Sequence, residues 1–378
     1  MNEHELLRKT LKNFVTKEIE PGARLRDKQE VFDLNLFRKL ADLGLLGITA
    51  PSEYGGSEMD ALSAVIAHEE LSYSDPGFTL AYLAHAMLCV NNLATNGSES
   101  QKNKYLPGLC TGELIGCMAM SEPGNGTDVI GMQSTAVRQD NHYVINGRKM
   151  WITNGVLDES GTPADIVYLY AKTGTKISTF IVTPDCPGYF VGQKIKDKTG
   201  MRASNTAELV FDNCIVPVEN RVGEEGDSVK HMMRNLELER LTLAAMGLGI
   251  GKRSLDIMVA YASERKAFGK PLTHFGQIQQ HLADTYAEYQ AAKAYIYQTA
   301  LKPSGNRLDS DGVKLISARM AKKAADSAMQ VLGGNGYVAE FVAERLWRDA
   351  KLLEIGGGTL EAHQKNIAGD LEKCGGKF

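Results

Sequence analysis

The sequence predicts an α+β fold, in which helices and strands occupy separate stretches of the chain. Residues 1 to about 116 and 223 to 378 carry apolar side chains at helical spacing. Between them, over residues 117 to 222, the pattern changes to short runs of period two separated by turn residues. This order predicts three domains: helical, β and helical.

The first segment is predicted to be helical throughout. Longer helices are expected over 62–72 and 78–96, and Asp33 is placed to cap a shorter one. His85 lies inside the second long helix, where we expect a buried, hydrogen-bonded core histidine. A first helix that ends at Pro21-Gly22 is predicted from these apolar residues: Leu6, Leu7, Leu11, Phe14 and Val15.

The middle segment carries the features of a β domain. Asn146-Gly147 lies between apolar runs, which is the strongest short signal for a hairpin turn. Short strands are expected over 166–171, 179–182 and 209–215. Together they predict a compact barrel or sandwich that ends near Asn220.

The last segment returns to long helical patterns. These cover 228–263, 274–301 and 310–332, followed by a glycine break and a last helix near 340–355. Gly247-Leu-Gly-Ile-Gly-Lys252 resembles a nucleotide loop but lacks the required glycine spacing and follows no predicted strand. We interpret its glycines as sites of close helix packing.

Composition excludes several classes of protein. Of the 378 residues, 43% are hydrophobic and 23% charged, which is ordinary for a globular protein. A net charge of −4 provides no electrostatic reason to bind nucleic acid or an anionic membrane. The six cysteines form no CxxC pair and are expected to be free thiols. With no signal peptide and no membrane span in the pattern, we expect a cytoplasmic protein.

Two long motifs carry the functional information. The first is Ala119-Met-Ser-Glu-Pro-Gly-Asn-Gly-Thr-Asp-Val-Ile-Gly131, whose glycines allow backbone N–H groups to approach a phosphate-bearing cofactor. The second is Gln330-Val-Leu-Gly-Gly-Asn-Gly-Tyr-Val-Ala-Glu340, continuing to Arg345 and Asp349. In sequence, order and separation they resemble the two signatures of the acyl-CoA dehydrogenase family, and most nearly its isovaleryl-CoA dehydrogenase branch.

The resemblance covers almost the whole chain and implies an architecture. It implies an N-terminal helical domain over 1–116, a middle β domain over 117–222 and a C-terminal four-helix bundle over 223–378. It further implies an FAD-dependent oxidoreductase that forms a homotetramer, as a dimer of dimers, and passes electrons to an electron-transferring flavoprotein.

The resemblance also assigns residues to the cofactor. Those that would line the flavin in the same subunit are Met120, Ser121, Thr127, Trp151 and Thr153. Those that would reach the cofactor of a neighbouring subunit are Arg265, Phe268, Gln330, Gly333 and Gly334, with further contacts from Thr359 and Glu361. One departure concerns the adenine end, where the family usually has a glutamine and this chain has Gly276, with Gln277 one place later.

The catalytic base is expected at Glu239. Most relatives place a glutamate before a Gly-Thr pair, where this chain has Gly357, whereas the isovaleryl branch carries its base in a Leu-Glu-Arg-Leu context like Leu238–Leu241. A carboxylate that shares a helix face with Leu243 would be partly desolvated, which raises its pKa. By the same resemblance Arg240 would contact coenzyme A, and Glu237, Leu243 and Thr127 would lie on the substrate side.

The glycines at 356–358 suggest the substrate. Without a tyrosine or glutamate side chain there, space is left at Gly356 for an acyl chain branched or cyclic near the thioester, and the Gly357 N–H is free to bind the thioester oxygen. The expected reaction is therefore α,β-dehydrogenation of a short branched acyl-CoA. Two alternatives stay open: a different flavin reaction on this fold, such as desulfination or nitroalkane oxidation, and a flavin-binding interaction protein without turnover.

Overall fold

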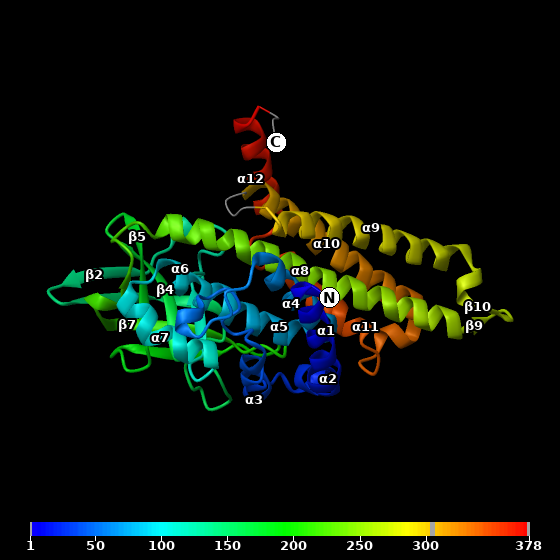
Figure 1. Cartoon of the computed structure of the whole chain (residues 1–378), viewed down its shortest axis with the longest axis horizontal. Helices are drawn as coiled ribbons and strands as arrows, with labels where there is room; N and C mark the ends of the chain where they lie inside the picture. Colours follow the sequence, from blue (N-terminus) through cyan, green and yellow to red (C-terminus); the bar gives the residue numbers. More distant parts are fainter. Residues whose placement is uncertain (1, 303–306, 376–378) are drawn as a thin grey trace.

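The computed structural model describes residues 2–302 and 307–375 of the chain. The molecule is elongated, with the β-sheet at one end and a small β9–β10 ribbon at the other (Figure 1). One helix, α8 (Ser228–Glu264), runs along most of the long axis between them. Helices precede and follow the sheet in the chain, which confirms the predicted α+β fold with helical, β and helical parts.

The N-terminal part is helical, with two π-helical turns. Its helices are α1 (Glu3–Phe14), the π-helix Val15–Ile19, α2 (Glu20–Gln29), α3 (Leu34–Arg38), α4 (Ala61–Ser74), α5 (Pro76–Leu83), the π-helix Ala84–Val90, α6 (Asn91–Asn96) and α7 (Glu99–Thr111). The predicted break at Pro21-Gly22 is wrong, because Pro21 lies in the first turn of α2. There a proline costs no hydrogen bond, since the first N–H groups of a helix have no intrahelical partner.

Two local predictions in this part are confirmed. The Asp33 carboxylate accepts a hydrogen bond from Leu36 N at 2.9 Å and caps α3. His85 is fully buried; its Nε2 lies 3.0 Å from the Leu109 carbonyl, and its Nδ1 accepts from Gly116 N at 3.1 Å. Burial lowers the pKa of His85 to about 4, so the ring is neutral and structural.

The middle part forms one sheet in the order β6-β7-β3-β2-β4-β5-β8, with β1 added parallel to β4. The strands are β1 (Gly116–Ala119), β2 (Thr135–Gln139), β3 (His142–Thr153), β4 (Ile166–Thr173), β5 (Lys176–Val182), β6 (Tyr189–Lys194), β7 (Thr206–Pro217) and β8 (Arg221–Val222). Alternate residues of β4 divide between two cores: Val167 and Leu169 face the core of the sheet, whereas Tyr168 and Tyr170 face the helices.

The hairpin predicted at Asn146-Gly147 is wrong. The chain instead turns at Asp140-Asn141, where β2 pairs with β3 and Asp140 adopts a left-handed φ of 49°. Gly147 lies inside β3 at a β-bulge opposite β7. A β-carbon there would come within 2.2 Å of Ser134 Oγ, so the glycine permits a close strand approach rather than a turn.

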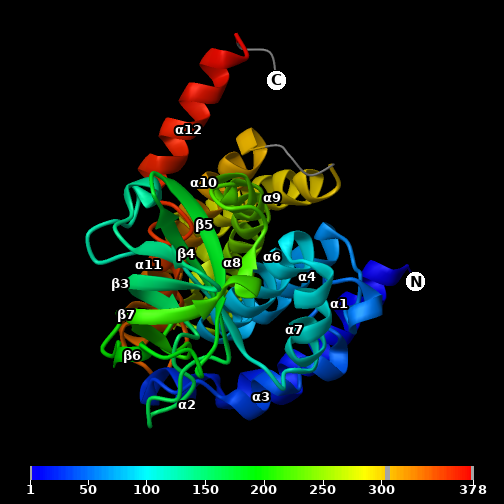
Figure 2. The ribbon, with the colours of Figure 1, turned by 90° about the vertical axis from the view of Figure 1, so that its left-hand side faces the viewer.

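The C-terminal part consists of long helices joined by short connections. Its elements are α8, β9 (Lys266–Ala267), β10 (Lys270–Pro271), α9 (Gly276–Ala300), α10 (Arg307–Leu332), α11 (Ala343–Leu353) and α12 (Leu360–Lys373). Sequence patterning predicts the first three helices well and places α11 near 340–355, but it misses α12. That helix projects from the body of the molecule in both views (Figures 1 and 2).

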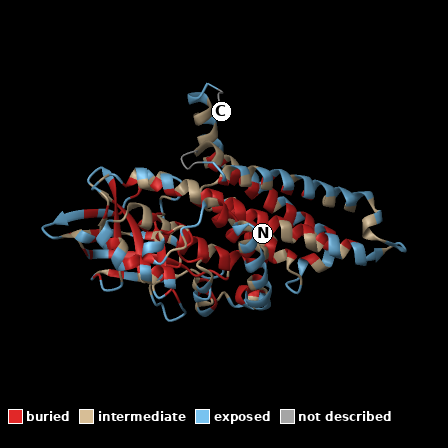
Figure 3. Ribbon diagram, in the orientation of Figure 1, coloured by how far each residue is buried: buried red, intermediate tan, exposed pale blue. Residues whose placement is uncertain are grey.

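Helix α8 is the centre of the packing and lies against α10 and α4. Buried residues are concentrated along the middle of the molecule, where these helices pack (Figure 3). The glycines of α8 make this approach possible: a β-carbon on Gly247 would meet Ser317 Oγ at 2.3 Å, and one on Gly249 would meet the Glu69 carbonyl at 2.4 Å. The packing interpretation of the glycine run is therefore correct. Among the described residues, no helix is long and apolar enough to cross a membrane.

Candidate active site

Glu239 is the twelfth residue of α8 and is only 6% exposed. Burial raises the pKa of its carboxyl to about 7, although the positive charges of Arg240 and Lys314 oppose the shift. Oε2 of this carboxylate makes no hydrogen bond with the described residues. A buried carboxylate with an oxygen that makes no hydrogen bond, and with a pKa near 7, is suited to accept a proton.

Two positively charged side chains and a second carboxylate are buried near Glu239. Arg240 forms an ion pair of 3.1 Å with Asp311 on α10, and Asp311 is fully buried. Lys314, one turn later on α10, donates to the carbonyl of Leu353 at the end of α11. Burial lowers the pKa of Lys314 to about 8. Arg240 is thus held by Asp311 within the protein, whereas Glu237 is half-buried on the same helix.

The glycine loop at 356–358 faces Glu239. A β-carbon on Gly357 would lie 3.5 Å from Glu239 Oε1 and only 2.2 Å from Leu243 Cδ1. Gly357 also has a left-handed φ of 67°, which side chains rarely adopt. Gly356 has more space, because its nearest contact for a β-carbon would be Leu352 at 3.5 Å. The loop therefore brings backbone without side chains close to the Glu239 carboxylate.

Further buried polar atoms near Glu239 were missed by sequence reasoning. The Tyr170 hydroxyl on β4 makes no hydrogen bond of normal geometry with the described residues. Burial raises the pKa of this hydroxyl well above its usual value, and the nearby Tyr168 and Glu239 add to the effect. Arg240 Nε and Asp311 Oδ2 are also buried without such a bond. Buried polar atoms without partners are costly, so a polar ligand would satisfy groups that the chain leaves open.

The first motif forms a loop after β1 that a buried ion pair holds in shape. Lys149 on β3 is fully buried and donates to Glu122 Oε1 at 2.9 Å and to the Met120 carbonyl at 3.0 Å. Glu122 also accepts from the backbone N–H groups of Gln133 at 2.6 Å and Ser134 at 2.9 Å. Burial opposes ionisation of Glu122, but these hydrogen bonds outweigh it and lower its pKa to about 2. The acidic residue of the motif is thus structural.

The surface of this loop is open at its glycines. A β-carbon on Gly124 or Gly126 would meet no atom within 4 Å. Met150 N donates to the Ser121 carbonyl at 2.9 Å, which brings β3 alongside the loop. Trp151 follows, 62% exposed and with a left-handed φ of 66° at a second bulge of β3. An exposed indole held on a strained backbone is typical of a ligand contact rather than of a core residue.

Residues assigned to the first motif differ in burial. Met120 is buried, Ser121 and Thr153 are half-buried, and Thr127 is exposed. At the other end of the glycine loop, Thr359 caps α12 by accepting from Ala362 N at 3.2 Å, and Glu361 is exposed in the first turn.

The residues assigned to a neighbouring cofactor lie elsewhere. Arg265 ends α8, and Phe268 is 95% exposed in the turn between β9 and β10, at the end of the molecule opposite the sheet (Figure 1). Gln330, Gly333 and Gly334 are exposed at the end of α10, and a β-carbon on either glycine would meet no atom within 4 Å. Gly276, the departure from the family pattern, is exposed at the start of α9 and likewise faces open space.

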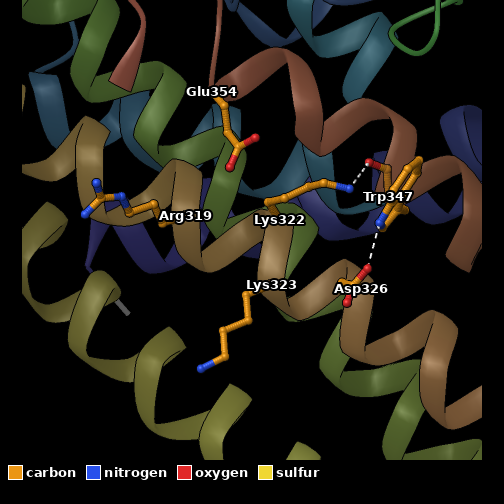
Figure 4. Close-up of a pocket in the computed structure, with 6 residues that line it drawn as sticks. All are labelled: Arg319, Lys322, Lys323, Asp326, Trp347 and Glu354. Atoms are coloured by element: carbon orange, nitrogen blue, oxygen red, sulfur yellow. Dashed lines mark hydrogen bonds between the residues drawn. The ribbon is translucent and has the colours of Figure 1, made fainter. Parts of the chain in front are cut away.

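A separate surface pocket of about 350 Å³ lies between α10 and α11 (Figure 4). The Lys322 ammonium lies 3.2 Å from the ring centre of Trp347, and Trp347 Nε1 donates to Asp326 at 2.9 Å. Its lining residues are Arg319, Lys322, Lys323, Asp326, Trp347 and Glu354. They include none of the residues assigned to cofactor or substrate.

Comparison with known proteins identifies the family. Three acyl-CoA dehydrogenase family models match in succession: the N-terminal domain over residues 1–113, the middle domain over 117–214 and the C-terminal domain over 227–371. The chain belongs to the acyl-CoA dehydrogenase family. It is 43% identical to the mitochondrial isovaleryl-CoA dehydrogenase of Oryza sativa, over 98% of this chain and 91% of the relative.

Solved acyl-CoA dehydrogenases have the same fold. Butyryl-CoA dehydrogenase from Megasphaera elsdenii superimposes with a TM-score of 0.93 at 35% identity, covering 98% of this chain and 99% of that one. A glutaryl-CoA dehydrogenase from Mycobacterium smegmatis, in complex with FADH2, gives 0.93 at 29% identity over 99% and 95% of the two chains. The family is thus established, while these relatives differ in the acyl group that their names specify.

Proposed function

We propose that this acyl-CoA dehydrogenase uses FAD to oxidise the Cα–Cβ bond of a short, branched or alicyclic acyl-CoA to the 2-enoyl-CoA. The observation that carries the proposal is the buried carboxylate of Glu239, whose Oε2 makes no hydrogen bond with the described residues, opposite the backbone of Gly357. Two further observations support FAD as the cofactor: the first-motif loop is open beside the exposed Trp151, and a relative has been solved in complex with FADH2.

In this mechanism Glu239 removes the α-proton, for which its pKa near 7 is well matched to neutral pH. FAD, when bound, supplies the acceptor for the β-hydride. The Gly357 N–H donates to the thioester oxygen and stabilises the negative charge that develops there. Arg240 contributes positive charge near the base, and its contact with coenzyme A would require sharing or leaving its ion pair with Asp311.

Two observations favour a branched substrate: the room at Gly356, and the similarity of the chain to isovaleryl-CoA dehydrogenases. Gly356 leaves room where a larger side chain would stand, and Leu243 closes the pocket from α8. Two relatives, each 43% identical to this chain, are named for the branched substrate isovaleryl-CoA: the isovaleryl-CoA dehydrogenases of Oryza sativa and Arabidopsis thaliana. Isovaleryl-CoA is therefore the leading candidate.

We also propose that a second copy completes each cofactor site. Arg265, Phe268 and Gln330 are exposed at the end of α8 and α10 away from the sheet, so they are free to serve a neighbour. A homotetramer, domain boundaries near residues 116 and 222, and an electron-transferring flavoprotein as acceptor complete the proposal.

Anaerobic titration of the purified flavoprotein with a panel of acyl-CoAs tests the function. Isovaleryl-CoA should bleach the flavin stoichiometrically, faster than octanoyl- or palmitoyl-CoA. If nitroalkanes or sulfinates bleach it and no acyl-CoA does, the proposed reaction is wrong. The non-catalytic alternative is disfavoured by family membership together with the buried base.

A further inference from the structure

His363 is the one buried residue of α12, although that helix projects from the body of the molecule (Figure 2). Its ring is fully buried and lies between two acceptors. Nδ1 lies 2.5 Å from Asp311 Oδ1, and Nε2 lies 3.1 Å from the Gly358 carbonyl oxygen. Both distances are those of hydrogen bonds, so the ring bridges the Asp311 carboxyl group and the Gly358 carbonyl.

These contacts join the two halves of the proposed active site. Asp311 Oδ1 is shared between His363 on α12 and Arg240 on α8, and Arg240 directly follows the base Glu239. On the other side His363 holds Gly358, which directly follows Gly357. A continuous path of buried contacts therefore runs from the base, through α10 and α12, to the loop that faces it.

A loop of three glycines has particular need of such an anchor. Glycine loses more conformational freedom on folding than any other residue, so three in succession favour many backbone states. On its N-terminal side the loop is held by the bond from Gly356 N to the Leu352 carbonyl at 2.7 Å. On its C-terminal side, a β-carbon on Gly358 would lie 2.9 Å from the His363 ring, so the ring and the backbone are in close contact.

We propose that His363 and Asp311 are positioning residues, which clamp the 356–358 loop so that the Gly357 N–H and the Glu239 carboxylate are held in register on the same substrate. This inference rests on the proposed function, because it assigns a purpose to the geometry of those two groups. Neither clamp residue touches the reacting atoms; both act through the loop and through Arg240.

Removing the clamp should affect reaction geometry more than affinity. In His363→Leu, the rate of flavin reduction in a single anaerobic turnover should fall by about 10- to 100-fold, as expected when reacting groups shift by about 1 Å. Binding of the enoyl-CoA product, followed by its perturbation of the flavin spectrum, should change by less than about threefold, since His363 acts on the proposed contact between Arg240 and coenzyme A only indirectly, through Asp311. His363→Gln, which can still donate to Gly358, should recover part of the rate.

Hydrogen exchange provides a readout that needs no substrate. Peptides that cover residues 355–362 should exchange faster in His363→Leu holoenzyme than in the parent, while those from the buried middle of α8 keep their protection. This measurement tests the clamp even if no acyl-CoA reduces the parent flavin, so failure of the clamp and failure of the proposed reaction are distinguishable. If His363→Leu does not fold, the nearly isosteric Asp311→Asn takes its place in both measurements. It should show the same changes in milder form.

His281→Leu is the matched control. His281 on α9 contacts Ser327 Oγ on α10 at 3.1 Å, which is a comparable tether remote from the glycine loop. It should leave both the reduction rate and the exchange of 355–362 unchanged. The clamp is refuted if His363→Leu and Asp311→Asn reduce flavin and exchange like the parent, or if the control reproduces their effects.

Discussion

Glu239 and Gly357 face each other across the proposed active site, and a β-carbon on Gly357 would lie 3.5 Å from Glu239 Oε1. The two positions at which family members are expected to carry the base are thus neighbours in space, although 118 positions separate them in sequence (357 minus 239). A carboxylate reaching from either backbone would arrive in the same volume, which explains how one side chain can replace the other.

Glu239→Gln tests the base directly. Glutamine keeps the size and polarity of the side chain but cannot accept the α-proton, so flavin reduction should slow by about 10²–10⁴-fold. FAD content and acyl-CoA binding should be retained. The effect of Glu237→Gln should be far milder, because a residue about 200° away around α8 would contact the substrate elsewhere and would not face the α-proton. Reduction of the Glu239→Gln flavin at the parental rate would assign the base to another residue.

Gly357→Glu in the Glu239→Gln background should not rescue activity by itself. The new β-carbon would meet Leu243 Cδ1 at 2.2 Å, and the left-handed φ of 67° adds strain. Adding Leu243→Ala removes the clash, so the triple variant should regain part of the reduction rate. Thermal unfolding and single-turnover rates should be measured on both. Equal activity with and without Leu243→Ala would contradict this account of the steric barrier.

The pH dependence of flavin reduction should report Glu239. Because burial raises its pKa to about 7, the rate should rise with pH through that value as the carboxylate forms. Between pH 4.5 and 7 the folded protein keeps a proton that the unfolded chain releases, so the free energy of unfolding should fall by about 3 kcal/mol across this window. Urea unfolding at either end of the window, in the parent and in Glu239→Gln, measures the difference. If the free energy of unfolding depends on pH in the same way in the parent and in Glu239→Gln, Glu239 is not the cause of the dependence.

Gly356→Tyr should change substrate preference without preventing folding. Gly356 has no left-handed φ, and the nearest contact for its β-carbon is an ordinary 3.5 Å from Leu352. The phenol would occupy the space left for a branch, so reduction by isovaleryl-CoA should fall relative to a straight-chain thioester. The ratio of kcat/KM values for isovaleryl- and butyryl-CoA is the measurement. An unchanged ratio in a folded, FAD-loaded variant would place the acyl branch elsewhere.

Arg265→Ala should weaken FAD binding and assembly together. The arginine is exposed at the end of α8, where its fork of donors is free to bind the pyrophosphate of a neighbour's cofactor. Lys266→Ala, one residue later and also exposed, serves as the control for loss of a single charge. Flavin content and sedimentation velocity are the readouts. A monomeric Arg265→Ala protein with parental FAD affinity would contradict the shared site.

Sequence patterning predicts best what is local. The 228–263 pattern matches α8 to within one residue at its end, because a helix of that length repeats its period many times. The Asn146-Gly147 signal failed because it reports only local turn preference, whereas the close approach of Ser134 determines what Gly147 does. Short α12 is missed because it buries just His363, which leaves little apolar periodicity to detect.

Long-range polar pairs escape this kind of prediction. Lys149 follows an Asn-Gly-Arg stretch that suggests an exposed loop, yet it is fully buried against Glu122. His363 and Asp311 are 52 residues apart and become informative only when α10 and α12 are brought together. Composition cannot reveal such contacts, since each depends on which helix faces which.

Helix α8 also fixes the distance between two proposed sites, since it carries Glu239 about a third of the way along its length and ends at Arg265. The 26 intervening steps span roughly 39 Å of helix, and one inserted residue would rotate Arg265 by about 100° relative to Glu239. If the two residues serve different cofactors, such a shift would disturb both sites at once. Single substitutions in this part of α8 can be tolerated, whereas an insertion or deletion between Glu239 and Arg265 should be selected against. Among related proteins, the length of this segment should therefore vary less than its sequence.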